Sequence, residues 1–204
     1  MIARQLRNAV SRRGAATVAF SGGSTPALML VALAELPVPW DVTTVFQVDE
    51  RIAPDGDHDR NATLLDVLRP HRPVIHLMPV TDGDPRAAIG RYADLVPQHL
   101  DMVHLGLGDD GHTASWPPGD PVIDDPGVVA LSQEYKGRVR MTLTVGVVNA
   151  ARRRLVLATG AAKASIVERW MLHDVALPVE RVGRTNTVVV LDTEAAARLP
   201  YQAR

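Results

Sequence analysis

The chain contains no cysteine among its 204 residues, so no disulfide can stabilise the fold and the redox compartment cannot be inferred from thiols. A chain of this length buries roughly 70% of its unfolded surface and needs no covalent or metal staple. Hydrophobic residues make up 46% of it and charged residues 22%, as in an ordinary globular protein. The length most simply fits one domain over 1–204, although two small domains fit it as well.

Long apolar runs and an excess of basic charge are also missing. No run approaches the roughly 18 apolar residues of a membrane span, and the first helix-like segment carries arginines where a signal peptide has an apolar core. The formal net charge is -1, so no broad basic field attracts nucleic acid. Arg152–Arg154 is short, and we expect it to be a solvated helix end. We therefore expect a cytoplasmic protein without nucleic-acid or membrane partners.

Motifs for metals and for a serine nucleophile are absent. The seven histidines have no metal-ligand spacing, and neither H-E-x-x-H nor G-x-S-x-G occurs. The acidic segment 55–61 imitates the start of a calcium loop. However, Arg60 stands where that loop needs glycine, and Asp66 stands where it needs a bidentate glutamate. We expect a solvated loop here, with no metal and no cofactor anywhere in the chain.

Runs typical of strands alternate with runs typical of helices. Several strand-like runs are continuously apolar, which suits strands covered on both faces. The alternation predicts an α/β fold with a doubly wound, mostly parallel sheet flanked by helices, whose ligands bind beyond the carboxyl ends of the strands. The predicted strands are Ala16–Phe20, Thr43–Val48, Val74–Leu77, Met102–Leu107, Val128–Leu131, Val139–Val145, Leu155–Thr159 and Thr187–Leu191. The predicted helices contain Ile2, Leu6 and Val10, then Pro26–Leu36, Asn61–Leu68, Asp84–Leu100 and Ala161–Leu172.

The first segment with chemical potential joins a strand to a helix. Gly22 and Gly23 let the backbone approach a ligand closely, and Ser24 and Thr25 add hydroxyl groups before Pro26. The unpaired N–H groups of the helix start favour an anion. The segment predicts a phosphate cradle, and local chemistry fits a tight turn with a helix cap equally well.

A second segment, Asp49-Glu50-Arg51, directly follows a strand. Adjacent carboxylates at such a place are costly unless they are paired or used. In the functional interpretation Arg51 clamps an anion and Asp49 faces the ligand as a polar or acid–base group. The alternative is a salt-bridged strand end.

A third segment contains Gly106, Gly108 and Gly111, which spell G-x-G-x-x-G. A dinucleotide site needs such a turn to lead straight into a helix, and Trp116-Pro117-Pro118-Gly119 cannot continue as one. His112 instead lies in a glycine-rich loop after a strand, where a neutral imidazole can take a proton from water. Alternatively, His112 binds the backbone of its own loop.

Two further cations lie near predicted strand ends. Arg140 falls on a late strand, and Lys163 follows Gly160 at a strand–helix junction. Both side chains can neutralise a phosphate dianion, although each alone is more often a surface charge. We expect them at strand ends of one sheet.

Together these segments resemble the 6-phosphogluconolactonase family. The resemblance covers nearly the whole chain and rests on several motifs in the family's order. They are Ser21–Pro26, Asp49–Arg51, Asp109–Ser115, Arg140–Thr142, and Gly160 with Lys163. It implies the fold of the sugar-phosphate isomerases and deaminases, and the hydrolysis of 6-phospho-D-glucono-1,5-lactone to 6-phosphogluconate in the oxidative pentose phosphate pathway. The implied partner is this small phosphorylated lactone, and we expect a monomer or a weak homodimer.

The resemblance also implies roles for particular residues. His112 is the general base for water, with Asp49 and Asp110 as the other catalytic residues; Asp49 either orients His112 or binds sugar hydroxyls. The phosphate is held by the cations and the glycine loop, namely Gly22, Gly23, Ser24, Thr25, Arg51, Arg140 and Lys163. Backbone N–H groups of 22–25 or of 108–111 are open alternatives for binding the oxyanion.

The sequence departs from the family at two places. Arg60 replaces the serine of a usual Asp-Ser-Asn, and Trp116-Pro117 replaces a usual Leu-Phe before Pro118-Gly119. Both departures bear on the shape of the substrate pocket. Two alternatives remain: a sugar-phosphate deaminase or isomerase, whose usual glutamate beyond the histidine is not found here, and a non-catalytic sugar-phosphate sensor, for which no DNA-binding segment is visible.

Overall fold

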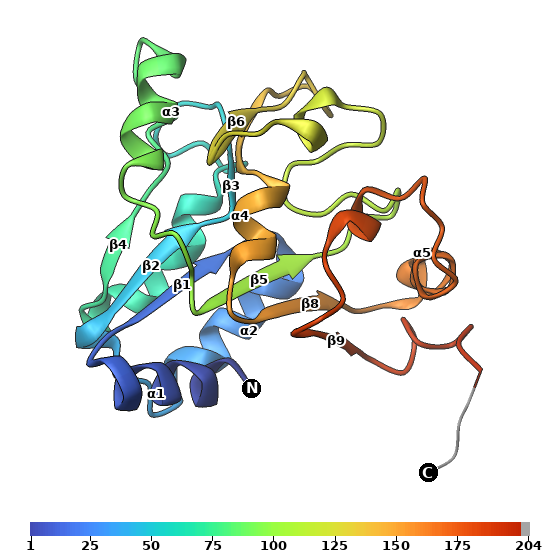
Figure 1. Ribbon diagram of the computed structural model, residues 1–204, viewed down its shortest axis with the longest axis horizontal. Helices are drawn as coiled ribbons and strands as arrows, with labels where there is room; N and C mark the ends of the chain where they lie inside the picture. The colour runs from blue at the N-terminus through green and yellow to red at the C-terminus, as the bar shows by residue number, and fades with distance from the viewer. Residues whose placement is uncertain (201–204) are drawn as a thin grey trace.

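A computed structural model describes residues 1–200, and its centre is a six-stranded parallel sheet in the order β4-β2-β1-β5-β8-β9. The doubly wound parallel sheet predicted from the sequence is therefore confirmed (Figure 1). From β1 the chain runs outward to β2 and β4, and it then returns to β5 on the other side of β1. The strands are β1 Ala16–Phe20, β2 Thr43–Gln47, β4 Val74–His76, β5 Met102–Gly106, β8 Arg154–Ala158 and β9 Thr187–Leu191.

Helices cover both faces of this sheet. Neighbouring residues on one strand enter different cores: Val18 and Phe20 pack with the α1–α2 side, and Ala19 packs with the α3–α5 side. This explains why the strand runs are apolar without alternation. The α-helices are α1 Ile2–Arg13, α2 Ser24–Ala34, α3 Pro85–Ala93, α4 Val145–Ala150 and α5 Ala164–Met171. The 3-10 segments are η1 Trp40–Val42, η2 Asn61–His71, η3 Pro121–Asp124, η4 Ala161–Lys163 and η5 Pro178–Arg181.

Two predicted helices have different forms. The helix predicted over Asp84–Leu100 ends at Ala93, whose carbonyl would need an N–H from position 97, where proline has none. The segment predicted as a helix from Asn61 is the 3-10 segment η2, which contains Pro70 and runs to His71. No helix among residues 1–200 is both long and apolar enough to cross a membrane.

A second, antiparallel sheet has the order β3-β7-β6 and lies above the parallel strands in Figure 1. Its strands are β3 Asp49–Arg51, β6 Val129–Leu131 and β7 Arg140–Leu143. The runs predicted over Val128–Leu131 and Val139–Val145 are therefore strands outside the parallel sheet. The chain leaves that sheet at Val48, whose N–H donates to Phe20 while its carbonyl accepts from Leu143. The small sheet thus covers the end of β2.

The arginine run differs from its prediction. Arg154 is buried at the start of β8, and its guanidinium donates to the carbonyls of Val148, Asn149 and Ala151 at the end of α4. The expectation of a solvated helix end holds for Arg152 and Arg153, which are exposed, and is wrong for Arg154. Free carbonyls at a helix C-terminus favour a cation, which explains why Arg154 turns inward.

His104 on β5 is fully buried, and neither ring nitrogen has a hydrogen-bond partner. Its imidazole lies near the ring of Phe20, with centroids 6.1 Å apart. Burial lowers the pKa of His104 to about 3 from its ordinary value of 6.5. The folded protein therefore keeps this side chain neutral where the unfolded chain would protonate it.

We predict that His104 destabilises the protein in mild acid. A lowered pKa leaves stability unchanged above pH 6.5 and costs stability as the pH falls below that value, by about 2 kcal/mol at pH 5. Urea unfolding at pH 5, 6 and 7.5 should show a smaller acid loss for His104→Leu than for the wild type. The exposed His71→Leu should keep the wild-type pH dependence. Parallel curves for wild type and His104→Leu would contradict the prediction.

Candidate active site

A cavity of about 220 Å³ lies at the carboxyl ends of β1, β5 and β8. The chain reverses its direction across the sheet between β1 and β5, and ligands of doubly wound sheets bind at such a switch point. Nine of the ten residues that the sequence singled out line this cavity, and Asp110 lies behind His112. The nine are Gly22, Gly23, Ser24, Thr25, Asp49, Arg51, His112, Arg140 and Lys163.

The Gly22–Thr25 turn joins β1 to α2 at one wall. Gly23 has a φ of 119°, which side chains rarely tolerate, and a Cβ on Gly22 would lie 1.8 Å from the Asn61 amide oxygen. No side chain caps the start of α2. Thr25 shares a hydrogen bond of 2.8 Å with Thr159 at the end of β8. The turn thus presents a helix start to the cavity, which suits an anion.

The loop after β5 holds His112 in a fixed position. A Cβ on Gly108 would lie 2.0 Å from His112 Nδ1, so glycine alone leaves space for the ring. The Gly108 N–H donates to the His112 carbonyl over 2.8 Å, and the Gly111 N–H donates to the Gly108 carbonyl over 3.1 Å. Thr113 Oγ1 donates to the Gly106 carbonyl over 2.8 Å. The glycines therefore serve loop closure, and no helix follows them.

Asp110 orients the imidazole of His112. His112 Nδ1 and Asp110 Oδ1 are 2.5 Å apart, and the other carboxylate oxygen accepts from the Tyr135 hydroxyl over 2.5 Å. Partial burial raises the pKa of Asp110, but the hydrogen bonds from Tyr135 and His112 outweigh it and hold the pKa below its ordinary range. An ionised Asp110 fixes the proton on Nδ1 and leaves Nε2 as a proton acceptor. This is the arrangement of an oriented general base.

The carboxylate of Asp49 contacts Ser115, whereas the sequence allowed it to orient His112. Its Oδ2 accepts a 2.7 Å hydrogen bond from Ser115 Oγ, and its carboxylate has no hydrogen bond to His112. The orienting role that we allowed Asp49 therefore belongs to Asp110. Burial raises the pKa of Asp49, against the opposing effects of Ser115 and of Arg51 and Arg140. Asp49 lines the cavity and can face a polar ligand there.

Two arginines lie opposite each other across β3 and β7. Arg51 pairs in register with Arg140, and both line the cavity. Arg51 donates to the Asn61 amide oxygen, whereas the buried Nε of Arg140 has no partner. Desolvation and the charge of Arg51 lower the pKa of Arg140. Like charges in register repel, so this pair favours a bound anion.

Lys163 approaches the cavity from the other side. It ends η4, directly after β8, and forms an ion pair with the exposed Asp109. Arg140 begins β7 of the small sheet. The two cations therefore line one cavity, but our expectation that they occupy strand ends of one sheet is wrong. Arg140 reaches the cavity from the antiparallel sheet, and Lys163 reaches it from the segment that follows β8.

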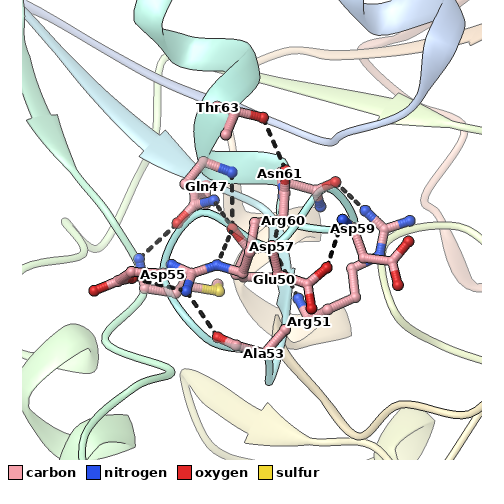
Figure 2. A network of polar contacts seen from close by, with 12 residues as sticks. Gln47, Glu50, Arg51, Ala53, Asp55, Asp57, Asp59, Arg60, Asn61 and Thr63 are labelled. Atoms are coloured by element: carbon pink, nitrogen blue, oxygen red, sulfur yellow. Dashed lines mark hydrogen bonds and ion pairs between the residues drawn. The ribbon is translucent and has the colours of Figure 1, made fainter.

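A buried network fixes the wall that carries Arg51 (Figure 2). Glu50 is fully buried, and its carboxylate accepts from the N–H groups of Arg51, Asn61 and Ala62 over 2.7–2.8 Å. Gln47 Nε2 donates to it over 2.8 Å, and Arg60 Nε lies 3.2 Å away in an ion pair. Glu50 thus connects β3 to the start of η2.

The departure at Arg60 is part of this network. Arg60 turns inward, where it pairs with Glu50 and donates to the Ala53 carbonyl over 3.0 Å, as Figure 2 shows. The predicted solvated acidic loop carries Asp57, His58 and Asp59, whose ligand atoms all lie within 4.8 Å of one another. Arg138 pairs with both of these aspartates. Arg138 thus compensates part of their negative charge.

Three groups that shape the site were given no role in the sequence analysis. Tyr135 belongs to no motif, and only the fold brings it to Asp110. Ser115 contacts Asp49, and Asn61 Nδ2 donates to the Asp49 carbonyl over 2.9 Å. For Ser115 and Asn61 the available signal was their place at the ends of the segments Asp109–Ser115 and 55–61.

Comparisons with known proteins match this chain to one family. The family model described as "Glucosamine-6-phosphate isomerases/6-phosphogluconolactonase" matches residues 1–191. A 6-phosphogluconolactonase of Synechocystis is 32% identical over 177 residues, which cover 79% of this chain and 74% of that protein. One of Pseudomonas aeruginosa is 34% identical over 178 residues, with coverage of 79% and 74%.

A solved structure agrees with these relatives. The crystal structure of a 6-phosphogluconolactonase from Shewanella baltica has a TM-score of 0.83 and 26% identity, and covers 93% of this chain and 88% of its own. The family model, the relatives and the fold agree on nearly the whole described chain. The chain therefore belongs to the family of glucosamine-6-phosphate isomerases and 6-phosphogluconolactonases.

Proposed function

We propose that this protein is a 6-phosphogluconolactonase, which hydrolyses 6-phospho-D-glucono-1,5-lactone to 6-phosphogluconate in the oxidative pentose phosphate pathway. The observation that carries the proposal is one cavity that contains both an oriented imidazole and a group of cations. The first can activate water and the second can hold a phosphate. The names of the relatives support the same reaction.

In the proposed reaction His112 Nε2 accepts a proton from water as the water oxygen attacks the lactone carbonyl carbon. Asp110 stabilises the resulting imidazolium through Nδ1. The imidazolium then gives its proton to the ring oxygen as the carbon–oxygen bond of the ester breaks. The products are a carboxylic acid, which ionises at neutral pH, and a free hydroxyl group. One base serves both steps, and no redox partner is required.

The tetrahedral oxyanion needs donors that are already in place. The N–H groups of Gly108, Gly111 and His112 are engaged in hydrogen bonds within their own loop. Two of the four N–H groups of 108–111 are thus occupied, whereas no hydrogen bond within residues 1–200 engages those of Gly22–Thr25, which favours Gly22–Thr25 as the oxyanion site.

The phosphate is proposed to bind the cations of the cavity. Arg140 offers its unpartnered Nε, and Arg51 lies beside it. Lys163 can exchange the exposed Asp109 for a phosphate oxygen at small cost, because exposed ion pairs contribute little to stability. Such an anchor sets the lactone carbonyl beside His112 and supplies orientation to the reaction.

Deamination is the alternative within the same family. Beyond His112 the chain turns into the core at Trp116, which is fully buried and donates Nε1–H to the Leu143 carbonyl over 2.9 Å. Trp116-Pro117-Pro118-Gly119 therefore offers no carboxylate for the additional proton transfers that deamination needs. A non-catalytic sensor is disfavoured by the His112–Asp110 pair, which binding alone does not require.

We predict that the purified protein accelerates opening of 6-phosphogluconolactone and releases no ammonia from glucosamine 6-phosphate. Acid release, measured against the spontaneous rate, reports the first reaction, and a coupled ammonia assay on the same sample reports the second. Ammonia release without lactone opening above background would overturn the proposed function.

The general base can be tested by substitution. His112→Asn should reduce lactone turnover by about 10² or more, because no second imidazole is found among the described residues that line the cavity. Circular dichroism should show an unchanged fold. The matched control is His58→Asn, since His58 is exposed and lies outside the cavity. Near-native turnover in folded His112→Asn would remove His112 from the mechanism.

The anchor can be tested in the same way. Arg140→Met should weaken binding of 6-phosphogluconate by about 10- to 100-fold, as expected for a lost charge-assisted hydrogen bond, and should hardly change binding of gluconate. Calorimetric titration with both ligands makes the comparison. Arg138→Met is the control, because Arg138 pairs with Asp57 outside the cavity. Equal weakening of both ligands would show that Arg140 has a structural role only.

A further inference from the structure

Tyr135 lies on the turn between β6 and β7, outside every motif of the sequence. The Tyr135 N–H donates to the Arg138 carbonyl over 2.9 Å, and Gly137 has a φ of 77°. This tight turn returns the chain to β7 and projects the tyrosine toward the loop after β5. Tyr135 is thereby in contact with residues of both functional parts of the cavity.

The hydroxyl of Tyr135 contacts the general-base pair. It donates to Asp110 Oδ2 over 2.5 Å and lies 3.3 Å from His112 Nδ1. The Tyr135 and His112 rings meet edge to face, with centroids 5.3 Å apart and planes at 66°. Each oxygen of Asp110 therefore has its own donor, the imidazole on one and the phenol on the other.

The ring of Tyr135 contacts the anchor. The Arg140 guanidinium carbon lies 5.1 Å from the ring centroid, and the Lys136 ammonium lies at the same distance. A guanidinium over an aromatic face is attracted by the ring electrons and is also restricted in its rotamers. Lys136 is exposed, whereas Arg140 is buried and lines the cavity.

We propose that Tyr135 is a positioning residue that connects the general base to the phosphate anchor: its hydroxyl limits the charge that Asp110 presents to His112, and its ring holds Arg140. The proposal rests on the proposed lactone hydrolysis. It assigns two separable functions to one side chain, because the hydroxyl and the ring can be removed in separate variants.

The charges around Tyr135 determine the direction of the effect. Asp110 and Asp109 come from the loop after β5, Arg140 from β7 and Lys136 from the turn. Partial burial and the Asp110 hydrogen bond raise the pKa of Tyr135, so its hydroxyl remains a donor. Without it, Asp110 Oδ2 loses a donor and the carboxylate attracts the imidazolium more strongly. The base is then protonated up to a higher pH.

Tyr135→Phe tests the hydroxyl. The acid limb of the pH profile of kcat/KM should move to higher pH by about 0.5 to 1 unit, the value of one hydrogen bond. Tyr92→Phe also removes a tyrosine hydroxyl, one that bonds the backbone of Gln47, and should leave the midpoint unchanged. Coincident profiles for Tyr135→Phe and the wild type would overturn this part of the proposal.

A second measurement needs no substrate. The imidazole proton signals of His112, identified by their loss in His112→Asn, should titrate at higher pH in Tyr135→Phe than in the wild type. If the wild type opened no lactone but this shift occurred, the proposed function would fail while the coupling stood. If lactone opening were normal and the shift absent, the coupling alone would fail.

Tyr135→Leu tests the ring. Relative to Tyr135→Phe, it should raise KM for the phosphorylated lactone by about 3- to 10-fold, because the contact with Arg140 is lost. For an unphosphorylated lactone the two variants should have the same KM. Thermal unfolding of both variants checks that a raised KM does not come from a general loss of fold. Equal KM values of the two variants for the phosphorylated lactone would overturn the role of the ring.

Discussion

The buried carboxylate of Glu50 is the constraint on which the geometry of the site depends. A buried charge is tolerated only when donors surround it, and Glu50 accepts from three backbone N–H groups and from Gln47 beside its ion pair with Arg60. Removal of one partner of such a pair typically costs about 3–5 kcal/mol. Because these bonds join β3 to η2, they place Arg51 and Asn61 together at one wall.

The reversal of strand order in the parallel sheet and the addition of the small antiparallel sheet assemble the rest of the site. The parallel sheet reverses its strand order between β1 and β5, which brings the Gly22–Thr25 turn and the His112 loop to the same opening. The small antiparallel sheet then covers the end of β2 and adds Asp49, Arg51 and Arg140. The base is held by its own loop, Arg51 and Arg140 by the second sheet, and Lys163 by η4 after β8. Reaction and anchoring are thus built on separate rigid elements.

Local chemistry was sufficient to predict the strands of the parallel sheet and the polar loops beyond them. A continuously apolar run such as Ala16–Phe20 is buried on both faces when it forms a strand between two layers of helices. The segment Val139–Val145 reads the same way, yet its strand pairs with Asp49–Arg51, because pairing partners depend on where the chain leaves β2. The inward turn of Arg154 depends likewise on carbonyls supplied by α4.

Most of the polar residues that line the cavity could be singled out from the sequence, but their contacts could not. The sequence singled out Asp49 and Asp110 beside His112, and only distances assign the His112 contact to Asp110 and the Ser115 contact to Asp49. Tyr135 lies 25 residues from Asp110 along the chain, in a turn without a recognisable motif. Contacts of this range are fixed by tertiary packing, which residue spacing does not encode.

The proposed reaction requires that one cavity orients a phosphorylated lactone with its ester carbon toward His112. The most direct test is a crystal structure with the product 6-phosphogluconate bound. We expect phosphate oxygens within hydrogen-bond distance of the Arg140 guanidinium and the Lys163 ammonium, and the product carboxylate beside His112 Nε2. A phosphate group against His112, or a product bound outside this cavity, would contradict this expectation.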